Sequence, residues 1–144
     1  MSLAAVSLLL VDAGLNPSGV AGILANIDVE TGGTFDYKQV EVGGDGYGLF
    51  QLDPSGPLPT AYAEYRAGRL DSAMLQVNFM LDTIYGDRQD VIGRGNARIL
   101  REVIEEGTAV EVAVEFSNRW ERPSIPHLER RKEAALKYCN KVNK

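Results

Sequence analysis

Apolar residues recur every three to four positions through most of the chain, which is the spacing that buries one face of an α-helix. Asn16 and Pro17 are typical of a helix start, and Gly32 and Gly33 are typical of a helix end. The pattern predicts helices over 3–13, 17–31, 60–67, 72–85, 97–106, 109–119 and 127–141.

The stretch 35–53 differs from the helical segments. It carries aromatic residues and valines around a glycine-rich turn at 43–46, a composition typical of short strands joined by a tight connection. We therefore expect a small β-hairpin wing after the second helix. The expected fold class is α+β, predominantly α-helical, in a single domain over 1–144.

Two polar patterns mark expected helix starts. Asp71 precedes an apolar segment and is a candidate N-cap. Thr108 and Glu111 have the spacing of a capping box, in which each side chain bonds the backbone of the other residue.

Composition and charge narrow the classes of function. The chain has 144 residues, of which 44% are hydrophobic and 24% charged, a balance typical of a globular domain with a real core. Its formal net charge is −5. This acidic balance argues against nucleic acid and against an anionic membrane surface as partners, because both attract clustered Lys and Arg.

Cys139 and His127 are the single residues of their types. One cysteine forms no intrachain disulfide, and one Cys with one His cannot build a four-ligand structural zinc site. About 18 Å of predicted helix separates the two, which excludes a Cys–His nucleophile pair. We therefore expect no metal and no cofactor, and we expect any chemistry to rest on carboxylates, amides, hydroxyls and the backbone.

The apolar run 4–11 lacks a preceding Lys or Arg and is far shorter than the ~18 residues of a membrane span. We interpret it as a core helix rather than a signal peptide, and we expect synthesis in the cytoplasm.

Glu30 is the strongest catalytic candidate. It lies in the last turn of the second predicted helix, on the flank of the apolar stripe, and Gly19, Gly22 and Asn26 share its side. These small residues are expected to leave room for a ligand to approach. Partial burial and the negative end of the helix dipole both raise a carboxyl pKa, so that Glu30 can donate a proton near neutral pH. The alternative is a helix-terminal glutamate that points to solvent.

The segment 46–53 places Gly48 beside Gln51 and Asp53. A glycine lets a bulky ligand lie against the main chain, and Gln51 offers both a donor and an acceptor. The alternative is a tight turn followed by a buried apolar run.

Four segments follow one another along the chain: Asn-Pro-Ser-Gly-Val-Ala-Gly-Ile-Leu-Ala-Asn at 16–26, Glu-Thr-Gly at 30–32, Gly-Tyr-Gly-Leu-Phe-Gln at 46–51, and the segment 116–123, which ends in Trp-Glu-Arg-Pro. In this order they resemble the phage tail-associated lysozyme family. The segment 46–53 is also similar to a turn of goose-type lysozymes, and Gln-Val-Asn-Phe at 76–79 is similar to the helix that follows it there.

The resemblance implies a lysozyme-like fold and hydrolysis of the β-1,4 bond between N-acetylmuramic acid and N-acetylglucosamine in a peptidoglycan glycan strand. It implies that Glu30 is the acid, that Gly48 and Gln51 contact the substrate, and that Asp53 helps to position water. Asp45 only approximates a second carboxylate of the goose-type pattern, because the local spacing differs. This chain departs from the family at Leu52, where the family has a tryptophan, and by extra residues between Gly32 and the next phenylalanine.

The residues do not decide which side chain supplies the second catalytic carboxylate. The candidates are Asp53, Asp45 and Glu41, in that order of preference, and we expect an inverting reaction through a bound water molecule. Tyr47 and Trp120 are candidates for stacking against sugar faces, although a lone tryptophan near a helix end also suits a core position. Asn26 is a further candidate substrate contact on the Glu30 side of its helix.

We expect several further residues to have structural roles. Glu121 and Arg122 are expected to form a salt-bridged elbow, and the charged residues of 129–133 are expected to form a solvated helix face. His127 is expected at the surface and Cys139 as a small hydrophobic packing residue.

Two other functions compete with hydrolysis. A lytic transglycosylase would use one glutamate and the substrate's own hydroxyl to form 1,6-anhydromuramic ends. A wall-binding or virion structural module would keep the fold without the chemistry. The expected site of action is the cell wall, reached from a virion or at lysis, with other tail proteins as candidate partners.

Overall fold

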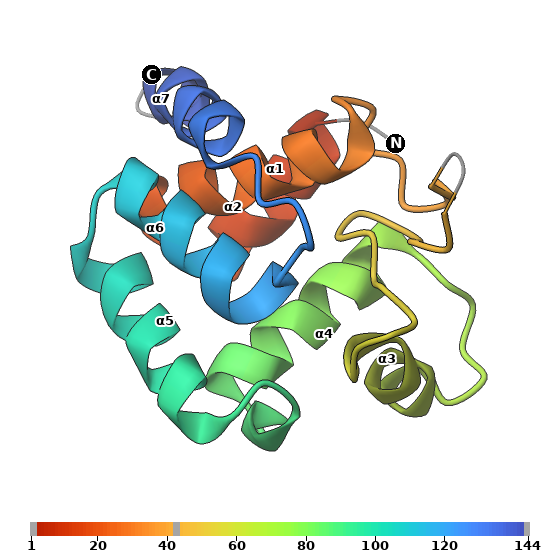
Figure 1. Cartoon of the computed structure of the whole chain (residues 1–144). Helices are drawn as coiled ribbons and strands as arrows, with labels where there is room; N and C mark the ends of the chain where they lie inside the picture. The colour runs from red at the N-terminus through yellow and green to blue at the C-terminus, as the bar shows by residue number, and fades with distance from the viewer. Residues whose placement is uncertain (1–2, 42–43, 143–144) are drawn as a thin grey trace.

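In the computed structural model, which describes residues 3–41 and 44–142, α-helices dominate (Figure 1). The α-helices of the described residues are α1 (Leu3–Asp12), α2 (Pro17–Thr31), α3 (Leu58–Arg66), α4 (Ala73–Tyr85), α5 (Arg94–Glu106), α6 (Ala109–Phe116) and α7 (Leu128–Val142). A 3₁₀ turn, η1 (Gln89–Val91), and a π-helical turn, η2 (Ser117–Glu121), complete the set. The predominantly helical prediction is confirmed. The helix expected over 109–119 ends instead at Phe116, because the chain continues as the π-helical turn.

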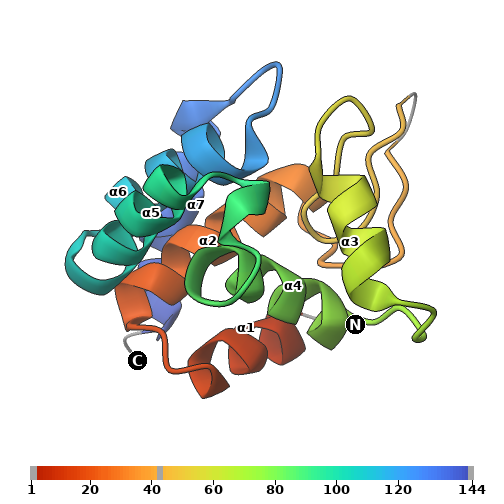
Figure 2. The ribbon, with the colours of Figure 1, turned by 90° about the horizontal axis from the view of Figure 1, so that it is seen from below.

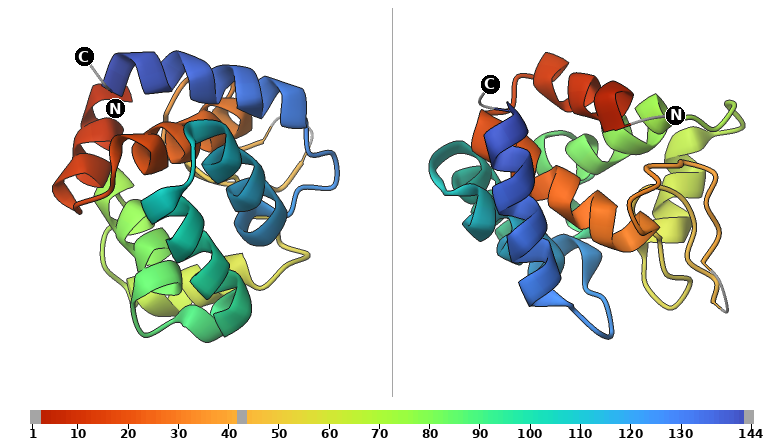
Figure 3. Two further views of the ribbon diagram at one scale, coloured as in Figure 1. Left: turned by 90° about the vertical axis from the view of Figure 1, so that its left-hand side faces the viewer. Right: turned by 90° about the horizontal axis from the view of Figure 1, so that it is seen from above.

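Helix α2 is the central element of the fold. It packs against α6 and α7, and α7 lies along it on the outside of the molecule (Figures 1 and 3). Small residues allow this close packing: a Cβ on Gly22 would fall 2.5 Å from Val112 of α6, and one on Gly19 would fall 2.8 Å from Ile104 of α5. The space beside these glycines therefore admits neighbouring helices, and the expectation that it admits a ligand is wrong.

The helix ends follow the local sequence with two exceptions. Gly32 ends α2 with a φ of 62°, and Thr108 and Glu111 form the predicted capping box of α6. Asn16 occupies the N-cap position of α2 but donates its amide to the Glu105 carbonyl instead of capping (2.7 Å). Asp71 is not the cap of α4, because the hydroxyl of Ser72 accepts from the Leu75 amide (3.0 Å).

The predicted β-hairpin wing is wrong. Within the described part of 35–53, pairing is limited to isolated bridges of Tyr47 with Val40 and with Leu52. Gly43, in the predicted turn, lies outside the described residues. Gly48 and Gln51 adopt positive φ values of 83° and 48°, so the backbone turns where a strand would need to stay extended.

Side-chain hydrogen bonds hold this segment in place of a strand ladder. The Asp71 carboxylate accepts the hydroxyls of Tyr47 (2.6 Å) and Tyr62 and the Gln76 amide (3.2 Å). Gln76 in turn accepts from the Leu49 backbone amide (2.9 Å). Burial acts to raise the pKa of Asp71, but these donors outweigh it and lower that pKa. The segment is thereby fastened to α3 and to the start of α4.

Helix α4 contacts both α1 and α3, as Figure 2 shows from below. Trp120 packs nearby in an aromatic cluster, with its ring centroid 5.1 Å from that of Phe116 and 5.0 Å from that of Phe50. Its indole N–H donates to the Thr83 hydroxyl (2.8 Å), and the residue is 1% exposed. Trp120 is therefore a core residue, and its expected stacking against a sugar face is corrected. Cys139, as expected, packs against the core as a half-buried hydrophobic residue.

No helix in the described ranges is both long enough and apolar enough to cross a lipid bilayer.

Candidate active site

A small cavity of about 90 Å³ lies where α2 ends. Three parts of the chain form it: the last turn of α2, the loop before α3 and the loop that follows η2. Its lining residues are Glu30, Glu41, Gly46, Gln51, Asp53, Glu121, Arg122, Pro123 and Ser124. The cavity therefore contains four carboxyl groups and, from the predicted substrate turn, Gln51.

Arg131 of α7 holds the Glu30 carboxyl. Its guanidinium donates to Oε2 of Glu30 (2.8 Å), to Oδ1 of Asn26 (2.7 Å) and to the Pro126 carbonyl (2.7 Å). The Arg131 side chain is 1% exposed and that of Glu30 is 15% exposed. The guanidinium thus holds one oxygen of the Glu30 carboxyl, and the exposed part of the Glu30 side chain lines the cavity.

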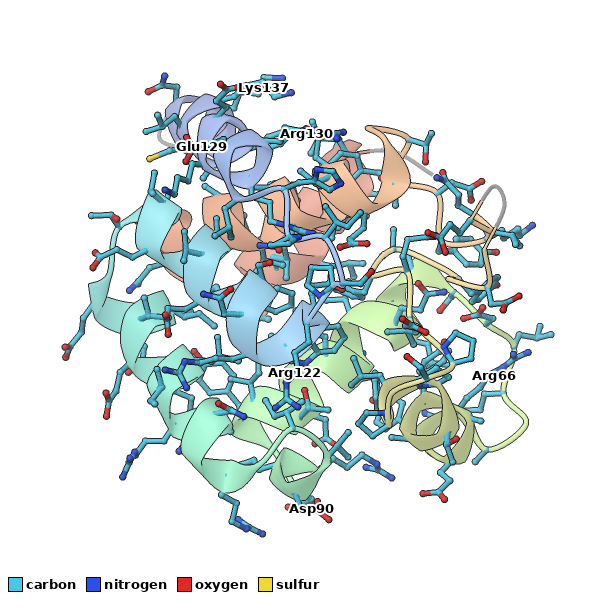
Figure 4. All side chains as sticks on the ribbon, in the orientation of Figure 1. Arg66, Asp90, Arg122, Glu129, Arg130 and Lys137 are labelled. Carbon is cyan, nitrogen blue, oxygen red and sulfur yellow. The ribbon has the colours of Figure 1, made fainter. Side chains whose placement is uncertain are left out.

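The prediction of a solvated helix face over 129–133 is wrong at Arg131, which is buried. Glu129 and Arg130, both labelled in Figure 4, are exposed. The side chain of Arg131 is 1% exposed and is paired with Glu30 of α2. The buried stripe of this helix includes Ala135 and Tyr138, and the three- to four-residue helical spacing places Arg131 on the same stripe. This helical spacing could have predicted from the sequence that Arg131 is buried. It does not identify the residue with which the buried arginine pairs.

Asn26 supports Arg131 rather than a ligand. It is fully buried, and its amide nitrogen donates to the carbonyls of Gly22 and Ala113 at 3.0 Å each. Its oxygen accepts from Arg131. Every polar atom of the side chain is therefore engaged inside the protein, and the expected contact between Asn26 and substrate is corrected.

The electrostatics of Glu30 agree with the prediction of a raised pKa. Burial is the largest cause and raises the pKa, while the hydrogen bond and charge of Arg131 act in the opposite direction. The negative charge of Glu41 raises it further, and His127 lowers it. The net result is a pKa above that of a free glutamate, which is the property that a proton donor at mild pH requires.

Glu121 is a second buried carboxyl in this cavity. Its Oε1 is sealed from solvent and has no hydrogen-bond partner among the residues that the structure describes. Burial holds the pKa of Glu121 well above its usual range, and the charge of Glu30 adds to this effect. Burial thus favours the protonated form of Glu121.

The expected ion pair between Glu121 and Arg122 is wrong. Among the ion pairs of the described residues none joins the two, and Arg122 instead donates to the carbonyls of Arg119 and Ile92, at 3.3 Å each. The π-helical turn explains the difference, because the Arg122 amide bonds the Ser117 carbonyl five residues back (2.7 Å). This wider turn directs Trp120 into the core and Glu121 to the cavity.

The glycine-rich turn is constrained from within. A Cβ on Gly48 would fall 2.6 Å from Oε1 of Gln76, so the glycine admits a protein side chain rather than a ligand. Gln51 donates its amide to the carbonyls of Gly48 (2.8 Å) and Gln39 (3.1 Å). Gln51 still lines the cavity, whereas Gly48 is buried beneath it.

The candidate second carboxylates separate in space. Asp53 and Glu41 line the cavity with Glu30, whereas Asp45 and Tyr47 line a different cavity beside α3. The Ser55 amide donates to Asp53 (2.9 Å), and this bond holds the Asp53 pKa below its usual value. Burial raises the pKa of Tyr47 to about 12, and its hydroxyl is committed to Asp71 rather than directed at Glu30.

Within the described ranges, His, Cys, Asp and Glu side chains form no group of three or more that could hold a metal ion.

The sequence profile of the phage tail lysozyme family matches residues 3–142, which is essentially the whole chain. The chain belongs to the phage tail lysozyme family. The resemblance drawn from its motifs is thereby confirmed, and membership assigns the protein to peptidoglycan lysis at the cell wall in general terms. Searches of curated proteins and of solved structures gave no significant match.

Proposed function

We propose that this phage tail lysozyme is a muramidase that hydrolyses the β-1,4 bond between N-acetylmuramic acid and N-acetylglucosamine. The observation that carries the proposal is a pair of carboxyls with opposite pKa shifts in one cavity. Glu30 has a raised pKa and Asp53 a lowered one. Such a pair supplies one acid and one base at the same pH.

In the proposed mechanism Glu30 donates its proton to the glycosidic oxygen as the bond from that oxygen to the anomeric carbon breaks. Asp53 accepts a proton from a water molecule, whose oxygen forms the new bond to the anomeric carbon with inversion. Glu41 is the alternative base because it also lines the cavity. Asp45 is the weaker candidate because it lines a different cavity.

Arg131 acts as a positioning residue in this mechanism. Once Glu30 has given up its proton, the carboxylate that remains is paired with the guanidinium at 2.8 Å. The same contact fixes one oxygen of Glu30, so that the other oxygen is the one available to the substrate. The pairing therefore favours release of the proton, while burial favours its retention before the reaction.

The decisive experiment replaces Glu30 by Gln and measures clearing of a peptidoglycan suspension. Glu30→Gln keeps the shape and removes the acidic proton, so we expect clearing to fall by at least about a hundredfold while co-sedimentation with the wall is unchanged. Glu129→Gln, on the exposed side of α7, is the matched control. Clearing that survives Glu30→Gln would remove Glu30 from the mechanism, and absence of clearing by the wild-type protein would favour a wall-binding module.

Mass spectrometry of the glycan ends separates the two cleavage chemistries. Reducing ends support the hydrolase. Ends carrying 1,6-anhydromuramic acid would show a lytic transglycosylase, in which the substrate's own hydroxyl replaces water.

A further inference from the structure

A larger cavity beside α3, called here the α3 cavity, is separated from the Glu30 cavity by the segment 44–54. Its volume is about 390 Å³. Residues of the segment line the two cavities alternately: Asp45, Tyr47, Leu52 and Pro54 line the α3 cavity, and Gly46, Gln51 and Asp53 line the Glu30 cavity. The segment is therefore a thin wall between the proposed catalytic cavity and a second cavity that the mechanism does not use.

Most of the wall of the α3 cavity is apolar. Leu52 and Pro54 contribute aliphatic surface, and Tyr47 and Tyr62 contribute aromatic surface. Both tyrosine hydroxyls donate to Asp71 and are therefore committed within the protein. The volume lies in the range of about 300–1,000 Å³ that is typical of sites for small ligands. The α3 cavity thus has the size and the wall of a ligand site.

Two charged residues, Asp45 and Arg66, also line the α3 cavity. Neither takes part in the ion pairs found among the described residues. Arg66, labelled in Figure 4, is half-buried at the end of α3, whereas Asp45 is exposed. The Arg66 Nε donates to the Arg69 carbonyl (2.6 Å), which anchors one edge of the guanidinium and leaves its two terminal amino groups for a ligand.

The two opposite charges select the ligand. A ligand whose only charge is a carboxylate would pair with Arg66 but would bring a like charge into the cavity of Asp45, and a ligand with only an ammonium group would do the reverse. An uncharged ligand would displace water from both side chains without replacing its hydrogen bonds, which is unfavourable. A ligand with an ammonium group, a carboxylate and an apolar part pairs with both residues and covers the wall.

In peptidoglycan these groups occur together on the peptide branches rather than on the glycan. A branch contains a diamino acid and ends in D-alanine, so a branch without a cross-link offers an ammonium group, a carboxylate and small methyl groups. The branch leaves the glycan at N-acetylmuramic acid, which is one of the two sugars at the bond that Glu30 is proposed to cleave. A peptide branch would therefore start close to the wall formed by the segment 44–54.

We propose that the α3 cavity binds a peptide branch of peptidoglycan, with the carboxylate of the branch on Arg66, its ammonium group on Asp45 and its apolar part against Tyr47 and Tyr62. This assignment rests on the proposed function. It makes Arg66 and Asp45 residues that determine specificity for the peptide, and it gives Asp45 a role outside the Glu30 cavity.

The test is an NMR titration with the tripeptide Nα-acetyl-L-Lys-D-Ala-D-Ala, which carries one ammonium group and one carboxylate. Two matched peptides each lack one charge: the Nε-acetylated peptide lacks the ammonium group, and the C-terminal amide lacks the carboxylate. The proteins are the wild type, Arg66→Gln, Asp45→Asn and Arg66→Lys, which keeps the positive charge. The exposed residues Arg98 and Asp90 supply the control variants Arg98→Gln and Asp90→Asn. Melting temperatures check that each variant is folded.

The wild type is expected to bind the tripeptide about tenfold more tightly than its amide, because Arg66 is half-buried. It should bind the tripeptide about threefold more tightly than the Nε-acetylated peptide, because an ion pair with the exposed Asp45 is weaker. Arg66→Gln should lose only the preference for the carboxylate, and Asp45→Asn only the preference for the ammonium group. Arg66→Lys should keep part of the carboxylate preference, and the control variants should match the wild type.

Unchanged preferences in folded Arg66→Gln and Asp45→Asn would overturn the proposal, as would the absence of tripeptide binding to the wild type in the millimolar range. Clearing by the wild type and its loss in Glu30→Gln are measured in parallel. A failure of the peptide site is thereby distinguished from a failure of the muramidase assignment.

Discussion

Replacing Arg131 by Met tests whether a buried guanidinium positions the proposed acid. Methionine keeps much of the apolar stem but removes the charge and the hydrogen bonds to Glu30, Asn26 and Pro126. The matched control is Arg130→Met, the same change at the neighbouring residue of α7, which is exposed on the outer side (Figure 4).

The magnitude follows from the burial of the pair. Removing one partner of a buried ion pair costs about 3–5 kcal/mol. Glu30 is 15% exposed and can take up a proton, so we expect the lower end, about 3 kcal/mol of unfolding free energy at pH 8. At pH 4 a protonated Glu30 leaves no uncompensated charge in Arg131→Met. The loss of unfolding free energy then falls toward the contribution of the hydrogen bonds to Asn26 and Pro126, roughly 1 kcal/mol each. Arg130→Met should change stability by less than about 0.5 kcal/mol.

The pH dependence has a defined sign. The folded-state pKa of Glu30 is already raised by burial, and losing Arg131 raises it further because the opposing charge is gone. Stability associated with this raised pKa is present below the pKa of a free glutamate and is lost as the pH rises through the folded pKa. The destabilisation by Arg131→Met therefore grows with pH, and the alkaline limb of the clearing activity moves to higher pH.

Urea unfolding at pH 4 and pH 8 and clearing rates from pH 4 to pH 9 provide the measurements. If Arg131→Met unfolds at the same urea concentration as Arg130→Met at pH 8, and its alkaline limb coincides with that of the wild type, the positioning role of Arg131 is refuted.

Three further predictions concern packing and buried charge. Glu121→Gln should be as stable as the wild type at pH 4 and more stable than the wild type at pH 8. The reason is that the Glu121 pKa is raised in the folded state, so the wild type loses stability as the pH rises through that pKa. A difference in urea midpoint that stays constant from pH 4 to pH 8 would contradict this prediction. Asp71→Asn should cost about 1–2 kcal/mol at pH 7 by weakening the bonds from Tyr47 and Tyr62, and the cost should shrink as the pH falls through the lowered Asp71 pKa; a cost that stays constant from pH 7 to pH 2 would show that the charge is irrelevant. Gly22→Ala should destabilise by about 1–3 kcal/mol in thermal unfolding because its Cβ would meet Val112, whereas Gly95→Ala, with open space around its Cβ, should stabilise by up to about 1 kcal/mol; equal melting temperatures for these two variants would refute the packing argument.

The sequence by itself determined the helices and the catalytic candidate, because those depend on neighbours within one or two turns. Pro17 and Gly32 bracket α2 at the predicted residues, and Thr108 with Glu111 forms the predicted capping box of α6. The raised pKa of Glu30 also followed from its place at the end of a buried helix. Family membership was likewise visible in the order of the local motifs.

Only the tertiary structure decided what surrounds Glu30. Arg131 lies 101 positions away in sequence, and no local pattern specifies which carboxyl a buried arginine will meet. The missing hairpin has the same origin: Asp71 and Gln76 reach back from the start of α4 and bond the segment that strand propensity assigned to a ladder. Propensities and caps act over a few residues, whereas the packing of α7 on α2 and the π-helical turn at Glu121 are set by the whole core.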